Sequence, residues 1–155
     1  MKFGDKTALF LATGACIGYT PFMPGTLGSL WGLPICWLLS KTALPIAMIF
    51  TLFFIILAVW IAHRAEKKIG QKDPSCIVID EVAGQITTLV GLPVNWISLA
   101  AGFVVFRGLD ILKPWPIRLV EKNISGGAGV VLDDVAAGIL GNILLQLVFH
   151  LTDII

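Results

Sequence analysis

The stretch Ala43–Ala62, ALPIAMIFTLFFIILAVWIA, decides the fold class. It carries no charge, and about twenty helical residues rise about 30 Å, the thickness of the hydrocarbon core of a bilayer. The whole chain has the same character: of its 155 residues 57% are hydrophobic and only 14% are charged, against roughly 25% charged in a soluble domain. We therefore predict a transmembrane helix here and a protein that folds in lipid.

Further apolar stretches lie on both sides of this helix. The first is short for a full span and contains glycine and proline, so we expect it to tilt or to re-enter the membrane. The fold predicted is all-α, an integral membrane bundle of about four to five spanning or re-entrant helices in a single domain, residues 1–155. The stretches are Leu27–Ser40, Cys76–Val90, Trp96–Phe106 and Val130–Leu151.

Basic residues gather in two of the connections. One follows Ala62 and the other is Arg107–Lys122. Loops rich in Lys and Arg stay in the cytoplasm, so both connections are predicted to lie on the cytoplasmic side of a multi-pass protein. The net charge of +1 gives no electrostatic support to a nucleic-acid partner.

Ionisable residues that are scattered in the sequence converge at the cytoplasmic ends of the predicted helices. An ionisable group in a membrane segment is costly without a partner or water, so such a cluster indicates a functional site. The residues are Asp80, Glu81, Arg107, Asp110, Lys113, Asp133 and Asp134.

Two adjacent acid pairs, Asp80-Glu81 and Asp133-Asp134, lie in otherwise apolar runs. Adjacent like charges in a low dielectric need a neutralising cation. Mg²⁺ fits best, because it takes hard oxygen ligands and combines carboxylates with water and phosphate. The alternative is that an acid of these pairs only caps a helix N-terminus, which we expect of at least one of the four.

Arg107, Asp110 and Lys113 are spaced i, i+3, i+6, which places them along one face of a helix. A carboxylate between two cations suits a site that holds both a metal and a phosphate, although an intrahelical salt-bridge ladder has the same spacing. Two glycine-bearing stretches, Pro24–Ser29 with Thr26 and Ser125–Gly129, are candidates to meet the phosphate, because glycine lets backbone N–H groups come close to an anion.

Four stretches of the sequence contain the candidate site residues named above: PFMPGTLGSL (Pro21–Leu30), DPSCIVIDEVAG (Asp73–Gly84), FRGLDILKPWP (Phe106–Pro116) and GGAGVVLDDVAAG (Gly126–Gly138). Taken together and in order, they resemble the phosphatidylglycerophosphatase A family. The resemblance implies a helical enzyme of the bacterial inner membrane, with its site on the cytoplasmic side. It also implies Mg²⁺-dependent hydrolysis of phosphatidylglycerophosphate to phosphatidylglycerol and inorganic phosphate.

We expect this lipid phosphatase site to use water as the nucleophile and the carboxylates as ligands of one or two Mg²⁺ ions. Arg107, Lys113 and Thr26 are expected to contact the substrate phosphate. A phospho-aspartate intermediate is the competing route, and a small membrane transporter or cation-binding membrane protein is the alternative function. The predicted metal ligands are Asp80, Glu81, Asp110, Asp133 and Asp134, and the predicted catalytic residues are Asp80, Glu81, Asp110 and Asp134. Oligomerisation is left open.

Overall fold

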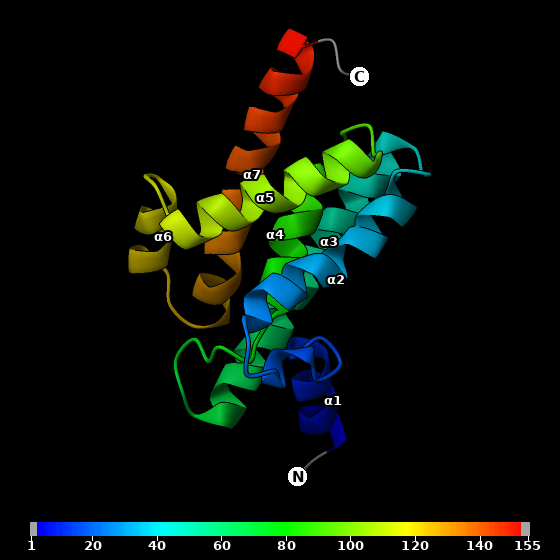
Figure 1. Ribbon diagram of the computed structural model, residues 1–155. Helices are drawn as coiled ribbons and strands as arrows, with labels where there is room; N and C mark the ends of the chain where they lie inside the picture. The colour runs from blue at the N-terminus through cyan, green and yellow to red at the C-terminus, as the bar shows by residue number, and fades with distance from the viewer. Residues whose placement is uncertain (1–2, 153–155) are drawn as a thin grey trace.

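The protein is a bundle of α-helices in a computed structural model that describes residues 3–152, and side chains from 6 to 151 (Figure 1). No strand occurs in this part of the chain, so the all-α prediction is confirmed. In chain order the elements are α1 (Phe3–Ala12), a 3-10 turn η1 (Ile17–Tyr19), α2 (Pro24–Leu39), α3 (Leu44–Ile69), α4 (Ile79–Leu89), α5 (Trp96–Leu112), α6 (Ile117–Asn123) and α7 (Gly127–Thr152).

Two of the described helices, α3 and α7, are long and apolar enough to cross a membrane. Each has 26 residues, which corresponds to about 39 Å of helix. The helix predicted at Ala43–Ala62 is thus confirmed, and it continues into the basic connection, where Gly70 ends α3 in a left-handed conformation with φ +75°. The positive charges of Lys67 and Lys68 in the last turn favour the helix, because they lie at the negative end of its dipole.

The short helix α4 lies at the centre of the bundle and packs against α2, α3, α5 and α7 (Figure 1). Only 11 residues long, it covers about 16 Å and cannot cross a bilayer alone. Its first two acids face the site described below. At its other end Asn142 of α7 donates its amide to the carbonyls of Thr88 and Val90, both at 2.9 Å, and so satisfies backbone groups left free by the end of the helix.

Glycines bring α4 and α7 into close contact. A Cβ added at Gly138 of α7 would lie 2.5 Å from the carbonyl oxygen of Gly84, and one at Gly84 of α4 would lie 2.8 Å from the carbonyl oxygen of Asp134. Small residues of this kind let helix backbones approach each other in membrane proteins. This contact fixes the distance between the acids of α4 and those of α7.

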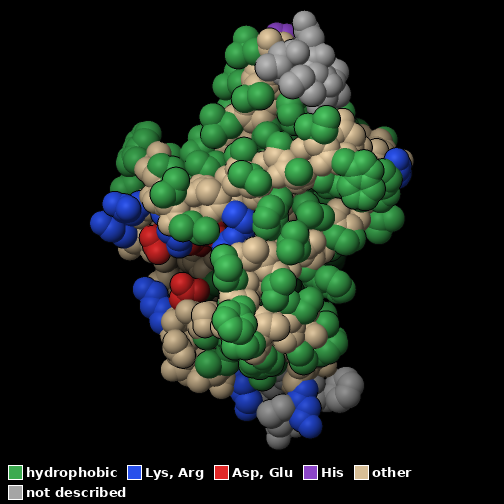
Figure 2. All heavy atoms as spheres, viewed as in Figure 1, with side chains coloured by type: hydrophobic (Ala, Val, Ile, Leu, Met, Phe, Trp, Pro, Cys, Tyr) green, Lys and Arg blue, Asp and Glu red, His purple; other side chains and the backbone are tan. Residues whose placement is uncertain are grey.

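The outer surface is dominated by apolar side chains, and charged side chains gather at a hollow and at one end of the visible face (Figure 2). Large hydrophobic residues of α3 such as Ile49, Leu52 and Phe53 are more than half exposed. An apolar surface of this extent is expected of a protein whose solvent is lipid rather than water. Two short helices, α1 and α6, were not predicted, and α6 lies within the charged connection that follows Arg107.

Candidate active site

A cavity of about 330 Å³ opens where α2 and α4 begin, where α5 ends and where α7 passes. All eight residues predicted as catalytic, metal-binding or phosphate-contacting line it, although they come from four helices. Those residues are Thr26, Asp80, Glu81, Arg107, Asp110, Lys113, Asp133 and Asp134. In Figure 2 the acidic side chains of the visible face, and some of the basic ones, lie around a hollow near the left edge.

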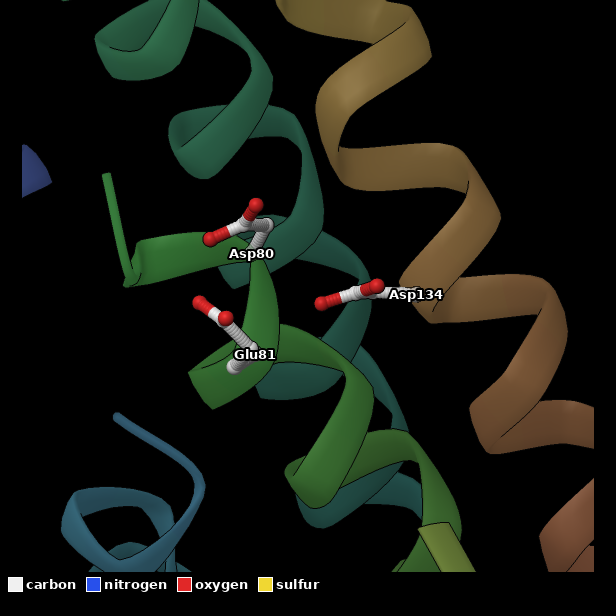
Figure 3. Close-up of side chains that lie close together, drawn as sticks. All are labelled: Asp80, Glu81 and Asp134. Carbon is white, nitrogen blue, oxygen red and sulfur yellow. The ribbon is translucent and has the colours of Figure 1, made fainter. Parts of the chain in front are cut away.

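The innermost part of the site is a group of three carboxylates. Asp134 points from α7 toward the first turn of α4, which carries Asp80 and Glu81 (Figure 3). One oxygen from each residue lies within 4.8 Å of the others. Asp80 and Asp134 are buried, and Asp80 Oδ1 and Glu81 Oε2 are buried without a hydrogen-bond partner among the described residues. Hard oxygen donors that converge and lack partners fit a divalent cation such as Mg²⁺.

The backbone of α4 also favours negative charge at this point, because the N–H groups of a first turn are free and the helix dipole is positive there. The side chain of Val78, the N-cap residue of α4, makes no capping hydrogen bond. Asp133 and Asp134 lie beyond the first turn of α7. Our expectation that at least one of the four acids lies at a helix N-terminus agrees with the position of Asp80 and Glu81 in the first turn of α4. All four acids line the cavity as well.

Arg107 forms the cationic wall on α5. Its Nη1 donates a hydrogen bond to Asp110 Oδ2, one turn later on the same helix, and lies 4.0 Å from Glu81 Oε1. The guanidinium therefore stands between the carboxylates of α4 and α5. The close approach of α2 depends on Gly25, because a Cβ there would lie 2.1 Å from Glu81 Oε1 and 3.2 Å from Arg107 Nη2.

Lys113 takes a different position from the one predicted. It ends α5 as the C-cap in a left-handed conformation, φ 43°, so it does not continue the face that Arg107 and Asp110 share. Its Nζ donates to Asp133 Oδ2 at 2.7 Å and to Glu121 Oε1 at 3.0 Å. Although partial burial acts to lower the pKa of Lys113, its hydrogen bonds to Asp133 and Glu121 raise that pKa overall. The side chain is therefore held as a cation at the cavity wall.

The two glycine-bearing stretches differ in their relation to the site. Gly25 and Thr26 line the cavity at the start of α2, where N–H groups of a first turn are available to an anion. Ser125, Gly126 and Gly129 instead line a neighbouring cavity of about 290 Å³ that shares Asp133 with the first. Only the stretch with Gly25 and Thr26 lines the cavity that holds the three carboxylates.

Sequence reasoning missed one acidic residue of the site and gave no role to the histidines. Asp73 lines the cavity in a left-handed conformation, φ 47°, and Glu66 Oε1 accepts a hydrogen bond from its backbone N–H at 3.2 Å. Its place at the head of the stretch Asp73–Gly84 was the available signal, but Asp73 does not belong to an acid pair within an apolar run. His63 and His150 do not line the cavity.

The balance of charge limits what the cavity can bind. Six carboxylates line it, against the cations of Arg107 and Lys113. When these groups are ionised, a phosphate dianion is repelled unless further positive charge enters. A metal cation in the cavity would supply positive charge of this kind.

Comparison with known proteins gives a consistent set of relatives. The sequence pattern described as "Phosphatidylglycerophosphatase A" matches residues 10–149. A protein of that name from Escherichia coli K12 is 39% identical over 141 residues, which cover 90% of this chain and 82% of the relative. Another from Haemophilus influenzae is 37% identical over 131 residues, 83% of this chain and 80% of the relative.

A Bacteroides thetaiotaomicron protein named "Putative phosphatidylinositol-3-phosphatase" is 37% identical over 155 residues, 94% of this chain and 95% of the relative. No solved structure matches the chain. All three relatives carry the names of phosphatases that act on phospholipids.

Proposed function

The chain belongs to the phosphatidylglycerophosphatase A family, and we propose on that premise that its acidic cavity is the active site of a lipid phosphatase. The enzyme hydrolyses phosphatidylglycerophosphate to phosphatidylglycerol and inorganic phosphate. The observation that carries the assignment of the site is the convergence of Asp80, Glu81 and Asp134 within 4.8 Å in a cavity that also holds Arg107 and Lys113.

The protein associates with membrane through its apolar helices, and we place it in the bacterial inner membrane with the cavity on the cytoplasmic side. The end of α3 that carries Arg64, Lys67 and Lys68 lies beside the start of α7, where a Cβ at Gly127 would be 2.2 Å from the backbone nitrogen of His63. By the positive-inside rule this end of the bundle is cytoplasmic. The site opens near the same end, where the headgroup of a cytoplasmic-leaflet lipid lies.

Mg²⁺ is the cofactor that the donor set fits. Asp80, Glu81 and Asp134 would hold it, with Asp110 and Asp133 as further direct or water-mediated ligands. When bound, the ion would offset the charge of the phosphate and make a bound water more acidic. The buried oxygens of Asp80 and Glu81 that have no partner among the described residues support this assignment.

The remaining side chains act on the phosphate by position and charge. Arg107 and Lys113 are oriented by Asp110 and Asp133, so each cation is fixed before the substrate arrives. Preorganised cations stabilise charge that develops on phosphoryl oxygens. Thr26 and the backbone of Gly25 offer hydrogen-bond donors at the start of α2.

A transport function is less well supported by the same residues. A transport path places ionisable groups near the bilayer midplane with access from both sides. Here the acids line one cavity, which is formed by the starts of α2 and α4, the end of α5 and α7, and two cations lie beside them. This arrangement fits a headgroup site.

Phosphate release by the purified protein in detergent tests the proposal. The substrates are phosphatidylglycerophosphate, phosphatidic acid, phosphatidylinositol 3-phosphate and a water-soluble phosphate monoester, each with Mg²⁺ and with EDTA. We expect Mg²⁺-dependent release that favours phosphatidylglycerophosphate. Preference for phosphatidylinositol 3-phosphate would assign the enzyme a different substrate. No phosphate release by folded protein would contradict the proposal that it is a phosphatase.

A further inference from the structure

An apolar groove lies between α2 and α5, away from the acidic cavity. Its volume is about 590 Å³, and its lining is almost wholly apolar. The residues are Leu33, Pro34, Trp37, Leu38, Trp96, Leu99 and Ala100. At its far end the rings of Trp37 and Trp96 stack with centroids 5.9 Å apart.

The two helices that form this groove also form part of the catalytic cavity. In Figure 1, α2 and α5 lie next to each other in front of α4. The start of α2 supplies Thr26 to the cavity, and the end of α5 supplies Arg107. The groove and the acidic cavity therefore lie at opposite ends of the α2–α5 pair.

On each of these two helices, one face carries residues from the groove to the acidic cavity. On α2, Trp37, Leu33, Leu30 and Thr26 follow one another at intervals of three or four residues, which places them on one face of the helix. None of the four is buried. This face of α2 runs from the groove to Thr26 in the acidic cavity.

A stripe of residues on α5, which meets the α2 stripe where Trp96 stacks on Trp37, has the same spacing. Trp96, Ala100, Phe103 and Arg107 recur at intervals of three or four residues, and again none is buried. A ligand that lies along both stripes leaves one end beside Arg107 and Thr26 and the other beside the paired tryptophans.

The length and chemistry of this path fit one occupant. From Thr26 to Trp37, as from Trp96 to Arg107, the helix rises about 16 Å. Half of a hydrocarbon core of about 30 Å is the depth that one acyl chain fills. We propose that the α2–α5 groove holds an acyl chain of the phosphorylated lipid whose headgroup occupies the acidic cavity; this inference rests on the proposed function.

The groove gives the enzyme a means to orient its substrate. Lipid tails gain little by leaving the bilayer for an apolar protein surface, so the groove acts on position more than on affinity. A chain fixed between α2 and α5 points the phosphate monoester at the carboxylates. Misplacement of a reacting group by about 1 Å costs up to about 100-fold in rate.

The first test narrows the groove. Ala100 is exposed on its wall, and Ala100→Trp fills the path about 10 Å from Arg107. We expect kcat/KM for dioleoyl substrate to fall about 10-fold to 100-fold, and kcat/KM for dihexanoyl substrate, whose chains stop short of Ala100, to stay within about twofold of the wild type. The matched control is Ile49→Trp on α3, which is 70% exposed and outside the groove.

Equal loss on both substrates, or equal loss in the Ile49→Trp control, would overturn the assignment. A second measurement does not depend on catalysis. Phosphatidylglycerophosphate that carries a diazirine at the end of one acyl chain is photolysed in the presence of wild-type protein. The labelled peptides are then identified. Labelling concentrated at 33–38 and 96–100 is expected, whereas labelling spread evenly over the exposed residues of α3 and α7 would refute the groove. If the wild type hydrolyses neither lipid, the proposed function fails, and the labelling pattern alone decides on the groove.

Discussion

Gly25→Ala perturbs the site at one atom without removing any functional group. The new Cβ would lie 2.1 Å from Glu81 Oε1, and ordinary contact begins at 3.4 Å. The carboxylate of Glu81 must therefore move by roughly 1.3 Å, and misplacement of about 1 Å costs up to about 100-fold in rate. We expect kcat for phosphatidylglycerophosphate to fall between about 10-fold and 100-fold.

The fold should tolerate this substitution. The atom that must move is the end of a flexible side chain, and Ala is a better helix former than Gly by up to about 1 kcal/mol. Gly108→Ala is the control, because it lies next to Arg107 on α5 and its Cβ would meet no atom within 4 Å. The assay is phosphate release in detergent together with thermal unfolding. Unchanged kcat in Gly25→Ala, or equal loss in Gly108→Ala, would refute the placement of Glu81 in the site.

Other substitutions test the parts of the bundle separately. Asn142→Leu leaves the carbonyls of Thr88 and Val90 without their amide donor, so thermal unfolding should show a loss of about 1–3 kcal/mol for each unpaired group; an unchanged Tm would show that the end of α4 needs no such partner. Gly138→Ala forces α7 away from the Gly84 carbonyl and should cost about 1–3 kcal/mol by the same measurement, whereas a stability gain would contradict the close contact. Arg107→Ala should lower kcat/KM by about 100-fold or more, as expected for loss of a fixed charge at a phosphoryl group, and unchanged kinetics would remove Arg107 from the site.

Much of this architecture is readable from the sequence, because lipid as solvent imposes strong patterns. The uncharged run Ala43–Ala62 predicted α3, and the acids in apolar runs predicted a shared cavity. Both predictions follow from the cost of charge and of unpaired backbone in a membrane. The eight site residues do meet in one cavity, while their catalytic roles stay predictions.

Other features depend on tertiary contacts that periodicity does not contain. Cys76–Val90 looked like one apolar helix, but α4 begins only at Ile79, and the partner that satisfies its far end, Asn142, is more than fifty residues away in the sequence. Lys113 had helical spacing from Arg107, yet its pairing with Asp133 and Glu121 accompanies a left-handed turn that ends α5. Asp73 was missed because it stands alone in a polar connection, outside the apolar runs that marked the other acids.

The central claim is that the carboxylates of α4 and α7 hold the cation that catalysis needs. The most direct test is the Mg²⁺ dependence of phosphate release by wild type, Asp80→Asn and Asp134→Asn, with Glu66→Gln as an acidic control outside the cavity lining. The account predicts that both aspartate variants fold, that their turnover falls by about 100-fold or more even at saturating Mg²⁺, and that Glu66→Gln keeps the wild-type Mg²⁺ dependence. Near-wild-type turnover in both aspartate variants, with the same requirement for Mg²⁺, would contradict it.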